Sequence, residues 1–216
     1  MLSQRSADQE HYRAALSTAA IQRCKRAMAD AVGLLPVAEA AAASIHETVR
    51  ATCVTVILMD GDQFWDLVDV WSPGFDYDRF PVDSRYPTSV YPVATERLLS
   101  GRGYFTGDAV DEVLIEYRRL WPEVNIGSIM GVPIIAMGEV HGEIFLLRDD
   151  MKPAFDRDEM DLVADLATLL GARLPALLAG HEDASEPDLA DAGTPGAVPR
   201  SRLTTKLTEL LRPHES

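Results

Sequence analysis

The sequence predicts an α+β domain built around an antiparallel sheet. Two observations predict the sheet, because two separate segments each show the pattern of a strand, a tight turn and a returning strand. A third observation predicts the helices, since apolar residues recur every three or four positions both before the first hairpin and after the second. With 216 residues, the chain is long enough for one sizeable core with extensions.

The second hairpin, over residues 128–147, is the most informative stretch of the chain. Its first half, Ser128–Ile135, is apolar and includes Gly131 and Pro133. Gly138 and Glu139 supply turn residues, and Glu143–Leu147 is the expected returning strand. The first hairpin, over residues 52–71, has a strand dense in Val, Thr and Ile, then the turn pair Asp60-Gly61 and a second strand from Gln63.

The remaining elements follow from helical periodicity and from Gly and Pro at their ends. Residues 72–85 are polar and aromatic and contain two prolines, which favours a loop. A short strand is expected near 104–107. The expected helices span residues 7–32, 36–50, 91–99, 111–120 and 156–178.

The two ends of the chain differ from the middle. We predict that residues 1–33 form an N-terminal helix whose stripe of Tyr12, Leu16, Ala20, Cys24 and Met28 makes a dimer contact. Residues 180–200 are acidic and rich in Pro, Gly and Ala, which predicts a flexible linker. Residues 201–216 contain a short amphipathic helix that is expected to dock on this chain or on a partner.

Charge and composition exclude several classes of partner. The net charge is −14, and phosphate backbones and anionic lipid surfaces require clusters of Lys and Arg, so neither nucleic acid nor membrane is expected as a partner. No apolar run approaches the roughly 20 residues of a membrane span. The N-terminus has acids, early arginines and no apolar signal region, so the cytoplasm is expected. The two cysteines are expected to be free thiols.

The order of elements over residues 34–179 resembles the GAF domain family of small-molecule sensor modules. The best local match is Ser128–Leu147, with Gly-Glu-x-x-Gly between its two strands. The resemblance implies an antiparallel sheet with helices on one face, usually at a dimer contact, and a ligand-side loop on the other. GAF domains hold cyclic nucleotides, bilins, haem or small metabolites under that loop, or serve as connectors without a ligand.

Several family ligands are disfavoured by departures from the family's motifs. The cyclic-nucleotide signature is only partly matched by Lys152, Phe155, Asp158 and Glu159, and no Asn precedes Lys152. Bilin-binding GAF domains need a cysteine in the loop or the following helix, and none follows Cys53. Cys53 alone also lacks the resolving partner that the GAF-fold methionine sulfoxide reductases use.

The ligand-side loop and its helices are rich in aromatic residues, which suits a pocket that is apolar with a few hydrogen-bond donors. The alternative is that these rings fill the space that a ligand would otherwise occupy. No catalytic or metal-ligating set is expected, and the sequence does not indicate a cofactor. The predicted ligand-binding residues are Tyr86, Tyr91, Leu98, Phe105, Tyr117, Trp121 and Met130.

The sequence therefore predicts a non-enzymatic sensory or regulatory module that acts as a homodimer and binds a small ligand or a protein partner. Two alternatives stay open: an interaction scaffold with a filled pocket, and a GAF-fold enzyme. A pocket of several hundred Å³ would favour the sensor, because small-molecule sites usually have that size.

Overall fold

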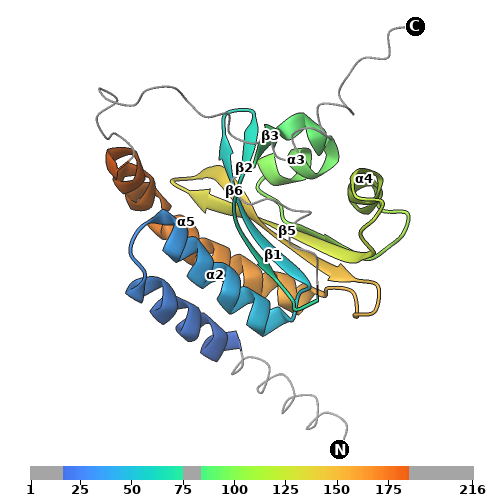
Figure 1. Ribbon diagram of the computed structural model, residues 1–216, viewed down its shortest axis with the longest axis horizontal. Helices are drawn as coiled ribbons and strands as arrows, with labels where there is room; N and C mark the ends of the chain where they lie inside the picture. The colour runs from blue at the N-terminus through green and yellow to red at the C-terminus, as the bar shows by residue number, and fades with distance from the viewer. Residues whose placement is uncertain (1–16, 75–83, 185–216) are drawn as a thin grey trace, which may run out of the picture.

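The computed structural model describes residues 17–74 and 84–184, in which six antiparallel strands form one sheet (Figure 1). The strand order is β3-β2-β1-β6-β5-β4, so the two long hairpins lie side by side in the middle of the sheet. β1 pairs antiparallel with β6, with Val54 opposite Leu146. This architecture confirms the predicted α+β class with an antiparallel sheet.

Both hairpins form where turn residues predicted them. β1 (Cys53–Asp60) and β2 (Gln63–Trp71) meet at a turn that contains Gly61. β5 (Ile126–Ala136) and β6 (Glu139–Asp149) meet at Met137 and Gly138, both with positive φ. Two consecutive positive φ values define the type I′ turn, which matches the twist of the strands and favours glycine at its second position. The turn thus lies one residue earlier than the predicted Gly138-Glu139 pair.

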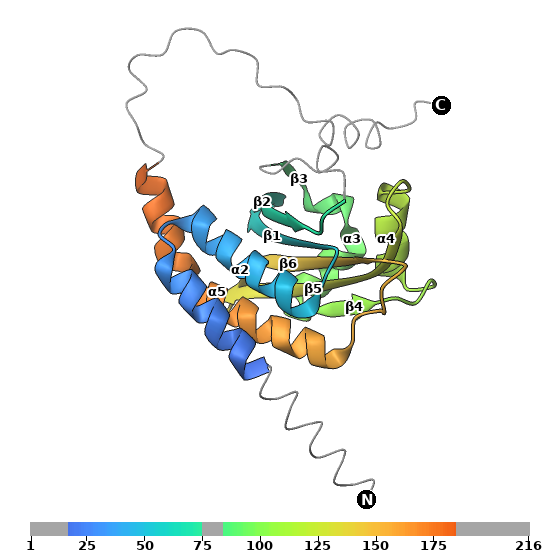
Figure 2. The same cartoon turned by 60° about the horizontal axis from the view of Figure 1, so that its bottom comes forward.

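Short elements at the edges of the sheet surround its second face. β3 (Arg85–Pro87) pairs with β2 and leads through a 3₁₀ turn (Thr88–Val90) into α3 (Pro92–Leu99). β4 (Tyr104–Thr106) pairs with β5, and α4 (Glu112–Leu120) follows it. In Figures 1 and 2, α3 and α4 lie on the opposite side of the sheet from α2 and α5.

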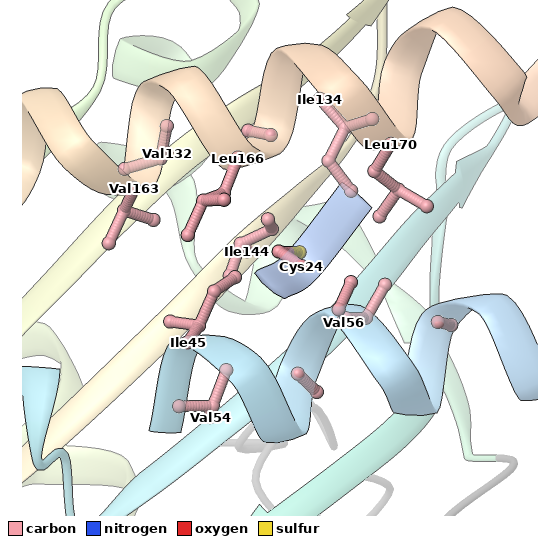
Figure 3. Packing of buried hydrophobic residues seen from close by; sticks show 14 of the residues in the cluster. Cys24, Ile45, Val54, Val56, Val132, Ile134, Ile144, Val163, Leu166 and Leu170 are labelled. Atoms are coloured by element: carbon pink, nitrogen blue, oxygen red, sulfur yellow. The ribbon is translucent and has the colours of Figure 1, made fainter. Parts of the chain in front are cut away.

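The first face of the sheet is covered by α2 (Leu34–Val49) and α5 (Arg157–Ala184), and a helix over residues 17–30 packs against these two helices (Figures 1 and 2). The core on this side is formed by apolar side chains from the sheet and all three helices. Figure 3 shows Cys24 in the same cluster as Ile45 of α2 and Leu166 of α5, each fully buried.

This packing corrects the predicted role of the N-terminal stripe. Ala20, Cys24 and Met28 are at most 2% exposed and lie in the core of their own chain. Gly33, with φ of 91°, turns the chain between the first helix and α2, so the stripe reaches the core despite its distance in sequence. These three residues are not a free dimer surface. Tyr12 and Leu16 lie outside the described residues.

α5 ends six residues later than predicted. It continues through Pro175 to Ala184, so residues 180–184 are helical rather than part of a linker. Residues 185–216, with the rest of the predicted linker and the C-terminal helix, lie outside the described part. By length and composition alone, Arg157–His181 is apolar enough to cross a membrane. Val163, Leu166 and Leu170 nevertheless bury its inner face in the core, as in the central helix of a folded domain.

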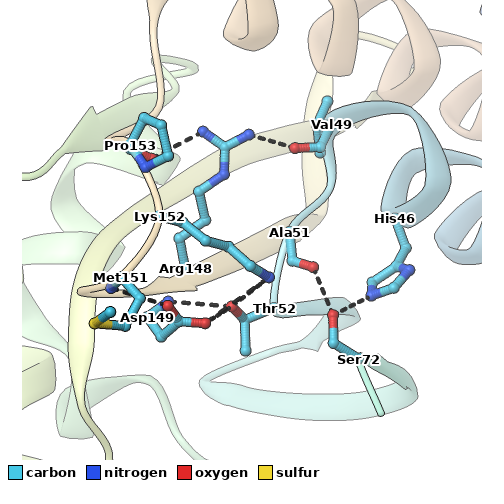
Figure 4. Close-up of polar contacts among 10 residues, drawn as sticks. All are labelled: His46, Val49, Ala51, Thr52, Ser72, Arg148, Asp149, Met151, Lys152 and Pro153. Atoms are coloured by element: carbon cyan, nitrogen blue, oxygen red, sulfur yellow. Dashed lines mark hydrogen bonds and ion pairs between the residues drawn. The ribbon is translucent and has the colours of Figure 1, made fainter.

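A polar network joins the end of α2 to the end of β6 (Figure 4). The buried Arg148 guanidinium donates to the carbonyl oxygens of Val49 and Pro153 and pairs with Glu159 at 2.6 Å. Lys152 Nζ donates to Thr52 Oγ1 at 2.9 Å and lies 3.8 Å from Asp149. Lys152 and Glu159, which resemble part of the cyclic-nucleotide signature, therefore tie strands and helices together here.

Candidate functional site

A small, partly enclosed cavity of about 60 Å³ lies on the second face of the sheet, beneath α3 and α4. A cavity needs roughly 10–15 Å³ to hold one water molecule, so this one can hold a few waters or a compact chemical group. Its floor comes from β1, β2 and β6, and its walls from β3 and the residues around α3 and α4. The lining residues are Cys53, Thr55, Ile57, Asp66, Asp69, Trp71, Tyr86, Tyr91, Tyr117, Trp121, Val124, Phe145 and Leu147.

Two acidic residues of β2 face the cavity because the strand contains a β-bulge. Val68 lies opposite Val56, but the next residue of β1, Ile57, lies opposite Asp66, so Leu67 is the extra residue. Leu67 and Val68 are both buried in the helix-side core. Without the bulge, residues three apart would point to opposite faces. With it, Asp66 and Asp69 both line the cavity.

The carboxyl groups of these two residues have strongly raised pKa values. Burial raises the pKa of Asp66 to about 8, with a further contribution from the negative charge of Asp69. Burial also raises the pKa of Asp69 to about 6, although hydrogen bonds from Thr55 and Trp71 oppose the shift. The Tyr86 hydroxyl donates to Asp66 Oδ1 at 2.8 Å.

A third acid, Glu143 of β6, lies on the same face. It sits opposite Ile57 of β1, which in turn sits opposite Asp66 of β2, so the two acids flank one strand. Two strand spacings place their backbones roughly 10 Å apart. Burial raises the pKa of Glu143 to about 8, although a hydrogen bond at 3.4 Å from the Tyr104 hydroxyl lowers it in part. The Tyr104 hydroxyl also lies 3.3 Å from that of Tyr117, which lines the cavity.

The aromatic side chains around the cavity contact one another in a continuous row. Tyr86 and Tyr91 meet edge to face at 5.9 Å, Tyr91 stacks on Tyr117 at 4.6 Å, and Tyr117 stacks on Phe145 at 4.7 Å. The Trp121 indole Nε1 donates to the Tyr91 hydroxyl at 2.7 Å. Aromatic pairs at these separations stabilise one another, so the rings form a fixed wall.

The start of α3 is held by α4. α3 has no capping side chain of its own, and the Glu116 carboxylate of α4 accepts from the backbone N–H groups of Val93 and Ala94 at 3.1 and 3.2 Å. These are among the amide groups that a helix N-terminus leaves unpaired. The contact fixes the position of Tyr91 immediately before α3.

Four of the seven predicted ligand-binding residues line the cavity: Tyr86, Tyr91, Tyr117 and Trp121. Leu98 is fully buried in the surrounding apolar cluster but is not one of the lining residues. Phe105 and Met130 do not belong to the pocket, and this part of the prediction is corrected. They lie opposite each other on β4 and β5 and pack in the helix-side core, because alternation along each strand turns them to the first face.

Asp66, Asp69, Thr55 and Cys53 are cavity residues that the sequence prediction missed. The available signal was three acids, at 66, 69 and 143, inside strands that are otherwise mostly apolar. Acids are rarely buried without a partner, which makes such positions informative.

The groups that line the cavity are mainly hydrogen-bonding and aromatic side chains. Burial raises the pKa of the Cys53 thiol well above its ordinary value, which keeps it protonated and weakly nucleophilic. Within residues 17–74 and 84–184, no group of three or more His, Cys, Asp or Glu side chains is arranged to hold a metal ion. Both described cysteines are free and buried. The site offers carboxyl acceptors, tyrosine hydroxyls and aromatic faces.

Comparisons with known proteins agree with this fold. A model of the GAF domain matches residues 33–174, so the chain belongs to the GAF domain family. Proteins of this kind are usually non-catalytic regulatory modules, and no enzyme family was found. The search of curated proteins returned no match.

Solved structures with a similar fold include two chromophore-binding domains of bacteriophytochromes. That of RpBphP3 from R. palustris has a TM-score of 0.63 at 14% identity, and the match covers 81% of this chain and 63% of that one. That of the Stigmatella aurantiaca protein, as a Thr289His mutant in the Pr state, has a TM-score of 0.64 at 13% identity, with 74% and 60% covered. The chain thus spans less than two thirds of either structure, and the likeness is one of fold.

Proposed function

We propose that this chain is a sensory or regulatory GAF module that binds a small molecule in the cavity beneath α3 and α4. The observation that carries this proposal is the polar lining of the cavity: Asp66 and Asp69 reach it only because of the bulge in β2. A surface that served only as packing would gain stability from apolar residues at these positions, because burying a carboxyl group without a charged partner is costly.

The cavity volume supports a compact ligand or the head group of a larger one. At about 60 Å³ it is well below the several hundred Å³ of a typical metabolite pocket. Volume alone therefore does not favour the sensor over an interaction scaffold with a filled pocket. The carboxyl groups favour the sensor, since a filled core has no use for them.

Native mass spectrometry of the purified protein, combined with thermal unfolding in fractionated metabolite extracts, tests the proposal. A ligand at 100 times its dissociation constant stabilises the folded state by about 2.7 kcal/mol. We expect a bound mass or a stabilising fraction with the natural protein. Val124→Phe, which fills the edge of the cavity, should abolish this ligand binding. Val110→Phe, at a site 76% exposed, should not. If no fraction binds, or if both variants bind alike, the scaffold is the better description.

We also propose that the module acts as a cytoplasmic homodimer that signals to a protein partner. Since Ala20, Cys24 and Met28 are buried within one chain, the contact must use other residues. Val32 and Leu35, which are exposed where the chain enters α2, are the first candidates. Light scattering of the natural protein and of a Val32→Asp, Leu35→Asp variant tests this. A dimer that the double variant converts to a monomer would support the contact, and an unchanged mass would exclude it.

A further inference from the structure

Among the residues that the structure describes, the lining of the cavity has carboxyl groups but no basic side chain (Lys, Arg or His). Asp66 and Asp69 face it from β2, and Glu143 lies on the same sheet face on β6. The other titratable groups packed around Asp66 are Cys53 of β1, Tyr86 of β3 and Tyr91 before α3, and Glu116 of α4 lies beyond Tyr91. All of these groups are neutral when protonated and negative when they lose a proton, so none of them supplies a positive charge.

The aromatic side chains around the cavity also favour a positively charged ligand. Tyr86, Tyr91, Tyr117, Trp71 and Trp121 all border the cavity. The face of an aromatic ring carries partial negative charge and attracts a cation within about 6 Å of its centre. Carboxyl groups and ring faces together make an environment that favours a positive group and disfavours an anion.

From these features we propose that the cavity binds the positively charged amine, amidine or guanidine group of a small organic ligand. The inference rests on the proposed function and adds the chemical class of the ligand. An organic cation is favoured over a metal ion, because the described residues hold no group of three or more ligating side chains. Its N–H groups would donate to Asp66 and Asp69, whose hydrogen bonds to a charged donor are the stronger kind.

Binding of a cation should be linked to loss of protons. The raised pKa of Asp66, about 8, and of Asp69, about 6, means that an empty cavity holds protonated carboxyl groups at lower pH. A cation stabilises the ionised form and therefore competes with the proton. Its affinity should rise as the pH is increased from 6 to 8.

Guanidinium and urea provide the test, because they are planar, similar in size and differ in charge. The three tryptophans make the readout specific, since Trp71 and Trp121 line the cavity whereas Trp65 packs on the helix-side core. The indole N–H signals of the ¹⁵N-labelled full chain are followed by NMR during titration with millimolar guanidinium chloride, urea or sodium acetate. These concentrations are far below the molar range that unfolds proteins.

We expect saturable shifts at Trp71 and Trp121 with guanidinium, and binding at least about tenfold weaker for urea and acetate. Asp66→Asn should weaken guanidinium binding at least about tenfold, since it removes the charged partner. Asp62→Asn, a matched change at an exposed acid in the same hairpin, should leave it unchanged. Binding of guanidinium to the natural protein should release protons, which calorimetry in two buffers measures. The Asp66→Asn variant should release fewer protons.

Three results would overturn the inference. If urea or acetate binds at the same signals as tightly as guanidinium, the cavity takes small molecules without a preference for cations, and the proposed function stands. If Asp66→Asn and Asp62→Asn behave alike, the carboxyl group is not the determinant. If no probe shifts Trp71 or Trp121, the cationic class is rejected, and the native mass experiment decides separately whether any ligand binds.

Discussion

The two faces of the sheet are built from the same six strands but have different compositions. The face under α2 and α5 is a continuous apolar core of Val, Ile, Leu, Ala and Met. The face under α3 and α4 combines aromatic rings with Asp66, Asp69 and Glu143, and encloses a cavity. Both faces bury apolar side chains, and the second also holds carboxyl groups that cost stability when they ionise. A protein keeps such groups where they are useful, so the second face is where function is expected.

The largest effect should come from the solid face. Leu166 of α5 is fully buried there, and Leu166→Ala removes three carbon atoms and leaves a cavity. We expect a loss of about 3–5 kcal/mol in the free energy of unfolding, measured by urea denaturation. Ile115→Ala, at a site 49% exposed on α4, is the control and should change it by less than about 0.5 kcal/mol. A small loss at Leu166 would mean that this face is not close-packed.

The next effect concerns Asp66, whose replacement should increase the free energy of unfolding at high pH. Its pKa is about 8 in the folded chain and close to 3.8 in the unfolded chain, so the folded state binds more protons between pH 4 and 8. The contribution of Asp66 to stability is therefore fully present below about pH 4 and is lost as the pH rises to 8. Glu143, with its pKa also near 8, adds to this fall.

The Asp66→Asn variant should accordingly be more stable than the natural protein at pH 8, by up to about 5 kcal/mol, because it removes the cost of ionising a carboxyl group whose pKa is raised from 3.8 to about 8. The two proteins should have similar stability at pH 4. Urea denaturation at both pH values measures the difference, with Asp62→Asn as the exposed control. Loss of stability at pH 8 would show that the Asp66 carboxylate is favourably paired in the folded chain.

Trp121→Ala separates a filled core from a cavity edge. Replacing a large aromatic residue in a solid core by Ala lowers the free energy of unfolding by about 3–5 kcal/mol. Trp121 is half-buried and borders the cavity, so we expect only about 1–2 kcal/mol, mostly from the lost hydrogen bond to Tyr91 and lost contact area. A loss above about 3 kcal/mol would favour the filled pocket of a scaffold.

The smallest effect is expected for Tyr86→Phe. The hydrogen bond from Tyr86 lowers the pKa of Asp66, so its removal should raise that pKa above about 8. The free energy of unfolding at pH 5, where Asp66 is protonated, should fall by about 1 kcal/mol at most. Carbon-13 NMR of the Asp66 carboxyl group measures the first change and urea denaturation the second. An unchanged pKa would show that the hydroxyl does not stabilise the carboxylate.

Most of the fold could be predicted from the sequence, because hairpins and amphipathic helices leave local signals. Asp60-Gly61 and Gly138 mark the two turns, and the leucines of residues 162–174 mark the long helix. The aromatic part of the site could also be predicted, since Tyr86, Tyr91, Tyr117 and Trp121 lie on the segments that cover the second face.

The acidic part of the site could not be predicted, because it depends on a bulge. Period-two alternation places Asp66 and Asp69 on opposite faces, and nothing in QFWDLVDVW indicates that Leu67 is the extra residue. Phe105 was misplaced because a three-residue strand such as β4 has too few positions to establish its alternation. Met130 was misplaced because β5 is buried on both faces, so its pattern does not show which face a residue joins. The burial of Cys24 depended on the turn at Gly33, which brings distant residues together.

A carbon-13 NMR titration of the carboxyl groups in the natural protein tests most directly whether the second face holds acids without a charged partner. We predict that Asp66 and Glu143 titrate near pH 8 and Asp69 near pH 6, with Asp62, an exposed acid of the same hairpin, as the reference. Such values would show that the second face holds buried acids without a charged partner, open to a cationic ligand. Titration of all three near pH 4 would show that they are already solvated or paired, and would contradict this prediction.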